Sequence, residues 1–341
     1  MQKGFLEQAE EEYCRAITLD SDNILYNYTL AYLYLVNKKY SLANKITDFI
    51  LTLDSSNMQA LALKLNVLIH SDKLSELGSI AEKIIQSKEK TEQSYYVLAL
   101  YYANMQVWNK AVENIKKAIA LNPKSCDYKY ESALYYFAIK NIDEAKNTCE
   151  EIIKLNNKYI DAYILLSKIY LETEDYENAN DNINKALDLD MNIAEIYYIK
   201  GILSEKINKK EKAIENYKIA ISMSPNNIGY YKSVAHCYYD LKDYIRANDY
   251  YKKVSEIDIT DGECHYYMAK CAEEKGNYDK AISHYSMARR LSPYNIQYLE
   301  DYVKILCLEK KKKQAISIIK NSIKIYDAQE KTKLKGLLNK I

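Results

Sequence analysis

The sequence predicts an all-α protein built from repeated pairs of antiparallel helices. Three observations indicate this fold class. The 341 residues include only 7 Gly and 3 Pro, too few for the tight turns of a sandwich or barrel. The prolines are separated by 102 and 68 residues, both multiples of 34, and stand at Pro123, Pro225 and Pro293. Alanine follows the same interval, at Ala9, Ala43, Ala111, Ala145, Ala179, Ala213, Ala247, Ala281 and Ala315.

The period defines nine full units when alanine is placed at position 20 and proline at position 32. These units are 24–57, 58–91, 92–125, 126–159, 160–193, 194–227, 228–261, 262–295 and 296–329. Apolar residues spaced by three or four predict a first helix and then a second in each unit. In 262–295 the turn between them is Lys275-Gly276-Asn277, where glycine supplies the unusual backbone angle.

Small residues at positions 8 and 20 allow the two helices of a pair to approach closely. Position 8 holds Ala31, Ala99, Ala133, Ser167, Gly201, Ala235 and Ala269. With an aromatic residue before position 8, and Ala-x3-aromatic-x2-Ala before proline, the pattern resembles the tetratricopeptide repeat (TPR) family over about residues 4–329. The resemblance implies a right-handed superhelical α-solenoid of antiparallel helix pairs, with a concave groove lined by first helices.

The sequence departs from the period in two places. The repeat 58–91 lacks the usual small residues, and the chain begins in the middle of a repeat. Leu65 and Leu77 stand at positions 8 and 20 of 58–91, so we expect a local irregularity there. We expect 1–23 to be an incomplete first repeat with a second helix only, 24–329 to be nine tandem repeats, and 330–341 to be a capping helix. The uncovered first helix suggests an array that extends upstream of Met1, with self-association through that end as the alternative.

The sequence shows no motif for catalysis or cofactor binding. It contains no HExxH, GxGxxG, Walker loop or GxSxG, and its four histidines are scattered. Cys237, Cys264 and Cys271 occur near His265, but their positions are apolar in other repeats, which favours buried thiols over a metal site. We therefore expect no enzyme activity, no cofactor and no metal.

Charge and cysteine usage indicate where the protein works. The net charge is +1, so no whole-chain field attracts nucleic acid or membranes, and a nucleic-acid partner is not expected. Seven Cys without CxxC spacing are typical of a reducing compartment. No signal peptide or transmembrane segment is evident, and we expect a cytoplasmic protein. The Lys-rich C-terminal residues are interpreted as a solvated cap.

The resemblance places positions 2, 5, 9 and 12 of the first helices along the groove. Tyrosine recurs there at position 5, in Tyr28, Tyr96, Tyr130, Tyr198 and Tyr266. Acids recur at position 2, in Asp127, Asp161, Glu195 and Glu263, and at position 12 in Glu205 and Glu273. Lys168, His236 and Lys270 at position 9 interrupt this acidity.

A tyrosine-lined, acidic groove suits an extended or helical protein segment that carries Lys or Arg. A small-molecule substrate is not expected. The alternative is that a chain with 36 Tyr places tyrosine everywhere, and that the acids merely keep the helices soluble. Tyrosine and acids at positions 5 and 2 argue against the carboxylate clamp of chaperone-binding members of the family.

Three functional hypotheses follow. The first is a non-catalytic scaffold that binds a segment of another protein in its groove. The second is the targeting region of a larger enzyme or assembly whose other domains lie outside this chain. The third is end-to-end self-assembly through the first helix.

Overall fold

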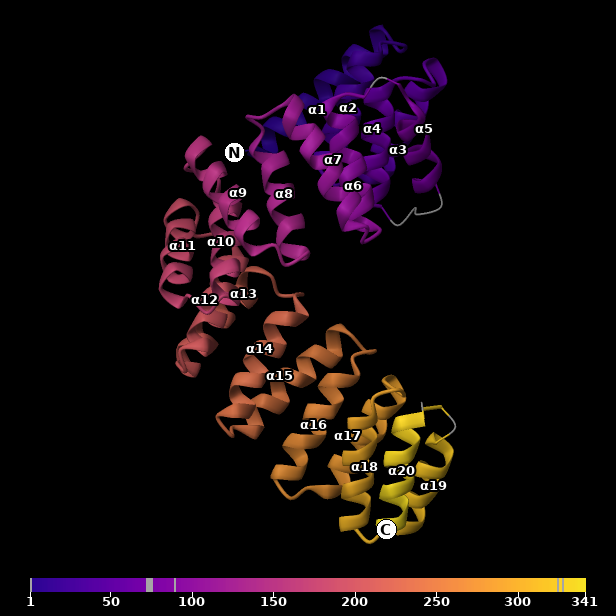
Figure 1. The fold of residues 1–341 in the computed structure, drawn as a ribbon, viewed down its shortest axis with the longest axis vertical. Coiled ribbons are helices and arrows are strands. Elements are labelled where there is room, and N and C mark those ends of the chain that lie inside the picture. The colour runs from indigo at the N-terminus through magenta and orange to yellow at the C-terminus, as the bar shows by residue number, and fades with distance from the viewer. Residues whose placement is uncertain (1, 72–75, 89, 324, 327) are drawn as a thin grey trace. The chain divides into compact units, whose positions relative to one another are not determined.

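The computed structural model describes residues 2–71, 76–88, 90–323, 325–326 and 328–341. In these residues the chain forms twenty α-helices and no strand (Figure 1). They belong to two compact units, Met1–Ile169 and Tyr170–Ile341, which we call unit 1 and unit 2. The boundary falls inside one helix, α10.

Consecutive helices form antiparallel pairs in each unit. The helices that begin in unit 1 are α1 (Gln2–Leu19), α2 (Ile24–Val36), α3 (Tyr40–Leu53), α4 (Met58–Ile69), α5 (Leu77–Gln86), α6 (Glu92–Asn104), α7 (Trp108–Leu121), α8 (Cys126–Ala138), α9 (Ile142–Leu155) and α10 (Ile160–Glu172). Those of unit 2 are α11 (Tyr176–Leu189), α12 (Ala194–Lys206), α13 (Lys210–Met223), α14 (Ile228–Asp240), α15 (Tyr244–Ile257), α16 (Gly262–Glu274), α17 (Tyr278–Leu291), α18 (Ile296–Leu308), α19 (Lys312–Ser322) and α20 (Ala328–Lys340).

The 34-residue phase sets the helix boundaries. All nine first helices begin at position 1, because a polar residue at the preceding position caps most of them. Seven such side chains accept a hydrogen bond from a backbone N–H of the first turn: Asn23, Asn57, Thr91, Ser125, Asn227, Asp261 and Asn295. Eight of the nine second helices in these repeats begin at position 17, and the ninth, α5, begins at position 20.

The core is packed around the small residues that the sequence singled out. At position 20 the alanines from Ala43 to Ala315 are fully buried, and at position 8 Ala31, Ala99, Ala133, Ala235 and Ala269 are fully buried as well. Gly201 shows why size matters there, because a Cβ atom at this residue would overlap the ring of Tyr217. The predicted all-α solenoid of antiparallel helix pairs is therefore confirmed.

The turn between the helices of a pair uses one left-handed residue at position 15. Gly276 adopts it with φ of 69°, as its sequence context suggested. Seven other repeats adopt it without glycine, with φ between 58° and 62°, at Lys38, Gln106, Lys140, Glu174, Asn208, Lys242 and Lys310. The turn is therefore a property of the repeat, and glycine is its least strained occupant.

The repeat 58–91 is irregular, as its two leucines suggested. Its second helix α5 has 10 residues, where the neighbouring second helices have 14, and it begins at position 20. Leu65 and Leu77 are both buried, so bulk replaces the usual pair of small residues. Lys64 on α4 is also buried and pairs with Asp48 and Glu76.

The first and last helices each pack on their neighbour. α1 lies within the residues 1–23 that were expected to hold a second helix only, and its Tyr13 and Ile17 pack against the core of α2 and α3. Nζ of Lys39 lies 2.7 Å from a carboxylate oxygen of Glu10. α20 buries Leu334 against the core of α18 and α19. No helix in the described ranges is long and apolar enough to cross a membrane.

Candidate functional site

A hollow opens on the first helices of unit 1. We call the surface formed by positions 2, 5, 9 and 12 of the first helices the groove face. The hollow has a volume of about 350 Å³ and is lined by α2, α4, α6 and α8. Its lining includes groove-face residues Tyr28, Tyr32, Leu35, Ala62, Asn66, Gln93, Tyr96 and Asp127. Three of the residues predicted from the sequence, Tyr28, Tyr96 and Asp127, thus lie around one hollow.

Small side chains on the irregular helix α4 form part of this lining. Where other repeats carry tyrosine at position 5, α4 has Ala62, and at position 9 it has Asn66. The side-chain oxygen of Asn66 is buried and has no hydrogen-bond partner among the described residues. A buried acceptor of this kind is costly unless a donor reaches it.

The walls of the hollow are aromatic and apolar. The rings of Tyr96 and Tyr128 stack with centroids 4.9 Å apart, and Tyr28 and Tyr32 lie one turn apart on α2. Tyr32 and Val36, which both line the hollow, are 50% and 49% exposed. This is apolar area that a ligand can cover.

The charges around the hollow are negative. Asp127 lines it, and Glu131 lies one turn further along α8. Burial, and then the charges of Glu131 and Asp127, raise the pKa of Tyr96. Burial, with a smaller contribution from Asp127, also raises the pKa of Glu131. No Lys or Arg occupies position 2, 5, 6, 9 or 12 of α2, α4, α6 or α8.

The groove face of unit 2 contains a closely related arrangement, but with its own cation. The rings of Tyr266 and Tyr298 stack with centroids 4.5 Å apart, and the Tyr266 hydroxyl donates to Asp301 at 2.7 Å. Nζ of Lys270 lies 3.3 Å from Asp301 and 5.6 Å from the centroid of the Tyr266 ring. Burial opposes it, but hydrogen bonds from Tyr266, Gln297 and Lys270 lower the pKa of Asp301.

Other predicted groove residues of unit 2 also find partners within the unit. Glu263 accepts from Nζ of Lys232 at 2.6 Å and lies 3.9 Å from Nε2 of His236. The hydroxyl of Tyr251 and Nδ1 of His236 share a hydrogen bond of 2.8 Å. Burial lowers the pKa of His236, which favours its neutral form. The ring of Tyr198 packs on Tyr230 with centroids 4.8 Å apart.

The acids expected at position 12 are engaged by buried tyrosines. The Tyr285 hydroxyl donates to Glu273 at 2.6 Å, and the Tyr217 hydroxyl donates to Glu205. Tyr217, Tyr251 and Tyr285 at position 24 are fully buried. Each hydroxyl thus reaches a polar group at the edge of the groove face, which satisfies a donor inside the core.

The remaining predicted residues lie close to the end of unit 1 or the start of unit 2. Tyr130 packs on Tyr159, whose hydroxyl donates to Asp127 at 2.9 Å. Asp161 and Lys168 lie on α10, and Glu195 lies on α12. The sequence analysis did not identify Tyr32, although it occupies groove position 9. It also did not identify Tyr128, because position 3 is not among the groove positions 2, 5, 9 and 12.

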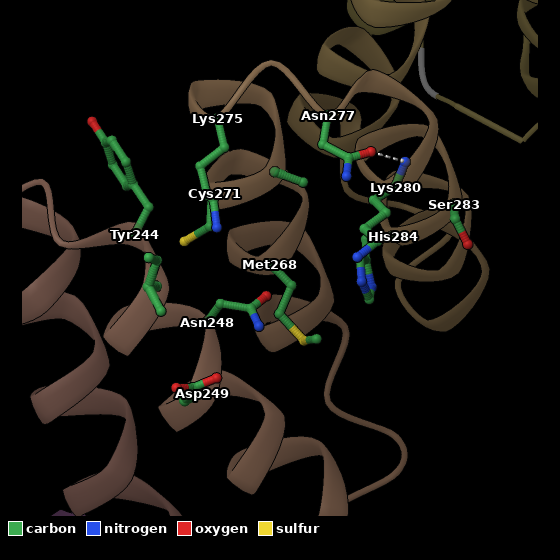
Figure 2. A pocket seen from close by; sticks show the side chains of 12 residues that line it. Tyr244, Asn248, Asp249, Met268, Cys271, Lys275, Asn277, Lys280, Ser283 and His284 are labelled. Atoms are coloured by element: carbon green, nitrogen blue, oxygen red, sulfur yellow. Dashed lines mark hydrogen bonds between the residues drawn. The ribbon is translucent and has the colours of Figure 1, made fainter.

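A second hollow, of about 400 Å³, lies away from the groove face of unit 2 (Figure 2). It is lined by α15, α16 and α17, with Asp249, Cys271, Lys275, Lys280 and His284 among the lining residues. Burial raises the pKa of the Cys271 thiol to about 12, which disfavours a reactive thiolate. No cluster of three His, Cys, Asp or Glu residues suited to a metal ion occurs in the described part of the chain.

Comparisons with known proteins support a repeat protein. The tetratricopeptide repeat model matches residues 92–125, 160–192 and 194–227, and the model of anaphase-promoting complex, cyclosome, subunit 3 matches 218–288. The first and third TPR matches coincide with units set by the alanine and proline phase. A search of curated proteins found no match.

Solved structures share the fold at low sequence identity. A chain of the APC/C hetero-tetramer Cut9-Hcn1 aligns with a TM-score of 0.63 and 17% identity, over 88% of this chain and 59% of that chain. This chain therefore spans less than two thirds of that one. The pilF protein of Pseudomonas aeruginosa aligns with a TM-score of 0.54 and 18% identity, over 62% of this chain and 97% of that chain. The 34-residue period, the paired helices and the family-model matches together show that the chain contains tetratricopeptide repeats, and the solved structures share its fold.

Proposed function

We propose that the protein is a non-catalytic interaction scaffold whose unit 1 groove face binds a segment of another protein. The observation that carries this proposal is the hollow between α2 and α8, which combines exposed apolar side chains, stacked tyrosines and acids. Tyrosine supplies contact area at a low entropic cost and keeps a hydroxyl for hydrogen bonds.

The charge of the surface indicates what kind of segment it binds. Asp127 and Glu131 have no ion pair among the described residues of unit 1, so a basic segment complements them. Val36, which lines the hollow and is 49% exposed, favours an apolar residue near the basic one. In unit 2, Glu263 already pairs with Lys232, so its contribution to selecting a basic segment is smaller.

Site-specific photo-crosslinking tests this proposal. A photoreactive phenylalanine analogue replaces Tyr32 in the full chain, which is expressed in source cells and crosslinked. The matched control places the same analogue at Tyr278, which is 38% exposed on the second helix α17. We expect Tyr32 to capture a discrete protein segment that the Tyr278 position does not. Equal capture at both positions would contradict a groove-face site.

Binding of the segment should also depend on the acids at the hollow. Asp127→Lys is expected to abolish crosslinking from position 32, whereas Glu82→Lys, the same reversal at an exposed site on α5, should leave it unchanged. Loss of crosslinking in both variants would indicate a general effect of charge rather than a site.

A second candidate function is that of a region of a larger enzyme or assembly, as in the second hypothesis drawn from the sequence. The other domains or subunits would then lie outside this chain. The match of residues 218–288 to the anaphase-promoting complex subunit 3 model favours it. Native mass spectrometry of the tagged protein from source cells tests this idea. A defined complex of several subunits would support it, and a monomer that recruits only a peptide would contradict it.

A further inference from the structure

The two units carry the same tyrosine and carboxylate positions on their groove faces. In unit 2 these are Tyr266 at position 5 and, from the next repeat, Tyr298 at position 3 and Asp301 at position 6. In unit 1 the corresponding residues are Tyr96, Tyr128 and Glu131. The ring pairs have the same geometry, with centroids 4.5 and 4.9 Å apart and interplanar angles of 20° and 30°.

The cation is the difference between the two arrangements. Position 9 of the first helix is Lys270 in unit 2, and its ammonium lies against both the Tyr266 ring and Asp301. The corresponding residue of unit 1 is Leu100, which cannot supply a charge. Position 2 is also more acidic in unit 1, where Asp127 replaces Gln297.

The electrostatic surroundings of the two carboxylates differ in the same sense. Hydrogen bonds, including one from Lys270, lower the pKa of Asp301 despite its burial. Burial and the neighbouring Asp127 raise the pKa of Glu131. Burial, two carboxylates and two tyrosines raise the pKa of Tyr96, and no cation is among the causes to oppose them.

From this comparison we propose that the hollow of unit 1 binds a lysine side chain of the partner segment, whose ammonium takes the place that Lys270 fills in unit 2. This inference rests on the proposed function and names the residue that the site reads. The ammonium lies against the Tyr96 ring, near Glu131 and Asp127, and the stem of the side chain covers apolar lining of α2.

The buried oxygen of Asn66 gives the site a further acceptor. It lines the same hollow and lacks a donor among the described residues. An ammonium has three donors, so one that enters the hollow can also supply a donor to this oxygen. The chain itself repeatedly places lysine over tyrosine, for example Lys110 over Tyr102 at 5.1 Å.

Two peptide pools test the proposal on the full chain. Both are fluorescein-labelled hexapeptides with random residues around a fixed centre, which is lysine in one pool and acetyl-lysine in the other. We expect the lysine pool to bind about tenfold more tightly, because acetylation removes the charge that the tyrosines and acids recognise. Equal binding of both pools would overturn the lysine site and leave a peptide-binding groove intact. Failure of both pools to bind would count against the lysine site and the proposed function together.

Leu100→Lys provides the sharpest variant, because it supplies the missing cation from within the chain. It should reduce the affinity for the lysine pool to that for the acetyl-lysine pool. The matched control is Leu155→Lys, the same change at a half-exposed site on the second helix α9, outside the lining of the hollow. A lysine preference that survives Leu100→Lys would overturn the proposal.

Two further variants keep the test decisive if Leu100→Lys disturbs folding. Asp127→Asn with Glu131→Gln removes both charges with little change of shape and should abolish the lysine preference. Lys270→Leu removes the internal cation of unit 2 and should create a second lysine-preferring site, seen as a higher binding stoichiometry. Preserved preference in the first variant would contradict the proposal.

Discussion

Unit 1 and unit 2 carry acids at the same repeat positions of the groove face, but the two units differ in whether a lysine of the chain pairs with those acids. On the groove face of unit 2, Lys232 pairs with Glu263 and Lys270 pairs with Asp301. On that of unit 1, Asp127 and Glu131 lie beside stacked tyrosines, and no Lys or Arg occupies position 2, 5, 6, 9 or 12 of α2, α4, α6 or α8. The acids of these positions are therefore paired with lysines of the same chain in unit 2, whereas the corresponding positions of α2, α4, α6 and α8 in unit 1 carry no lysine.

The largest expected effect concerns the tyrosines of the core in unit 2. Tyr285→Ala should destabilise unit 2 by about 3–5 kcal/mol, because it leaves a cavity at a fully buried site. Tyr285→Phe should cost only about 1 kcal/mol, since Glu273 keeps Lys304 at 3.5 Å. Denaturant unfolding measures both. In unit 1 the corresponding Ile115 has no polar partner, so Ile115→Val should cost about 1 kcal/mol through packing alone. A similar cost for Tyr285→Ala and Tyr285→Phe would show that the hydroxyl, not the ring, dominates.

Acidification should weaken unit 2 through its histidines. Burial lowers the pKa values of His236, His265 and His284, with the positive charge of neighbouring groups adding to the effect for His284. Because the unfolded chain then binds protons more readily than the folded one, stability falls as the pH drops below about 6.5. The slope cannot exceed about 1.4 kcal/mol per pH unit for each histidine. Hydrogen exchange at pH 7 and pH 5, corrected for intrinsic rates, should show faster opening of α14–α17. Unchanged protection of α14–α17 at pH 5 would contradict the prediction that acid destabilises unit 2.

Replacing one acid by its isosteric amide should change the free energy of unfolding in opposite directions in the two units. Glu131→Gln should stabilise unit 1 by up to about 1 kcal/mol at pH 7, because the raised pKa means that the charged form is disfavoured in the folded state. The gain should vanish below about pH 4, where the carboxyl is protonated in both states. Glu263→Gln should instead destabilise unit 2 by roughly 0.2–1 kcal/mol, since it removes a pair with Lys232. Chemical unfolding across pH measures both, and equal signs at pH 7 would remove the distinction between the two faces.

The smallest effect should be the same in both units. Lys140→Gly in unit 1 and Lys242→Gly in unit 2 replace left-handed residues with φ of 62° and 60°. Relief of backbone strain outweighs the extra entropy of the unfolded chain, so each should add about 0.5 kcal/mol. Gly276→Ala should destabilise by a comparable or larger amount, and Gly336→Ala in α20, where a Cβ meets no atom within 4 Å, is the control. Unequal gains at 140 and 242 would show that the turn is not equivalent in the two units.

The sequence predicted the fold well because its main signals are periodic. Alanine at position 20 and proline at position 32 determined where first helices begin, and all nine begin there. The left-handed turn was attributed to Gly276 alone, because lysine, glutamine and glutamate carry no sequence signal for that conformation.

The candidate site was only partly visible in the sequence. Tyr28, Tyr96 and Asp127 could be found because they repeat at fixed positions. The pairing of Lys270 with Asp301 was missed, since it joins position 9 of one repeat to position 6 of the next. The hollow itself depends on the small Ala62 and Asn66, which interrupt the tyrosine series and so carry no periodic signal.

The length of chain that supplies the lining of the hollow has a consequence for folding during synthesis on the ribosome. Hydrogen bonds between adjacent repeats join residues that are close in the chain, such as Lys39 to Glu10 at 29 residues and Tyr266 to Asp301 at 35. Each helix pair can therefore dock on the preceding one soon after it emerges. The hollow instead needs Tyr28 and Tyr128, which stand a hundred residues apart. If the hollow binds a segment of another protein, as we propose, a nascent chain folds well before it can capture that partner.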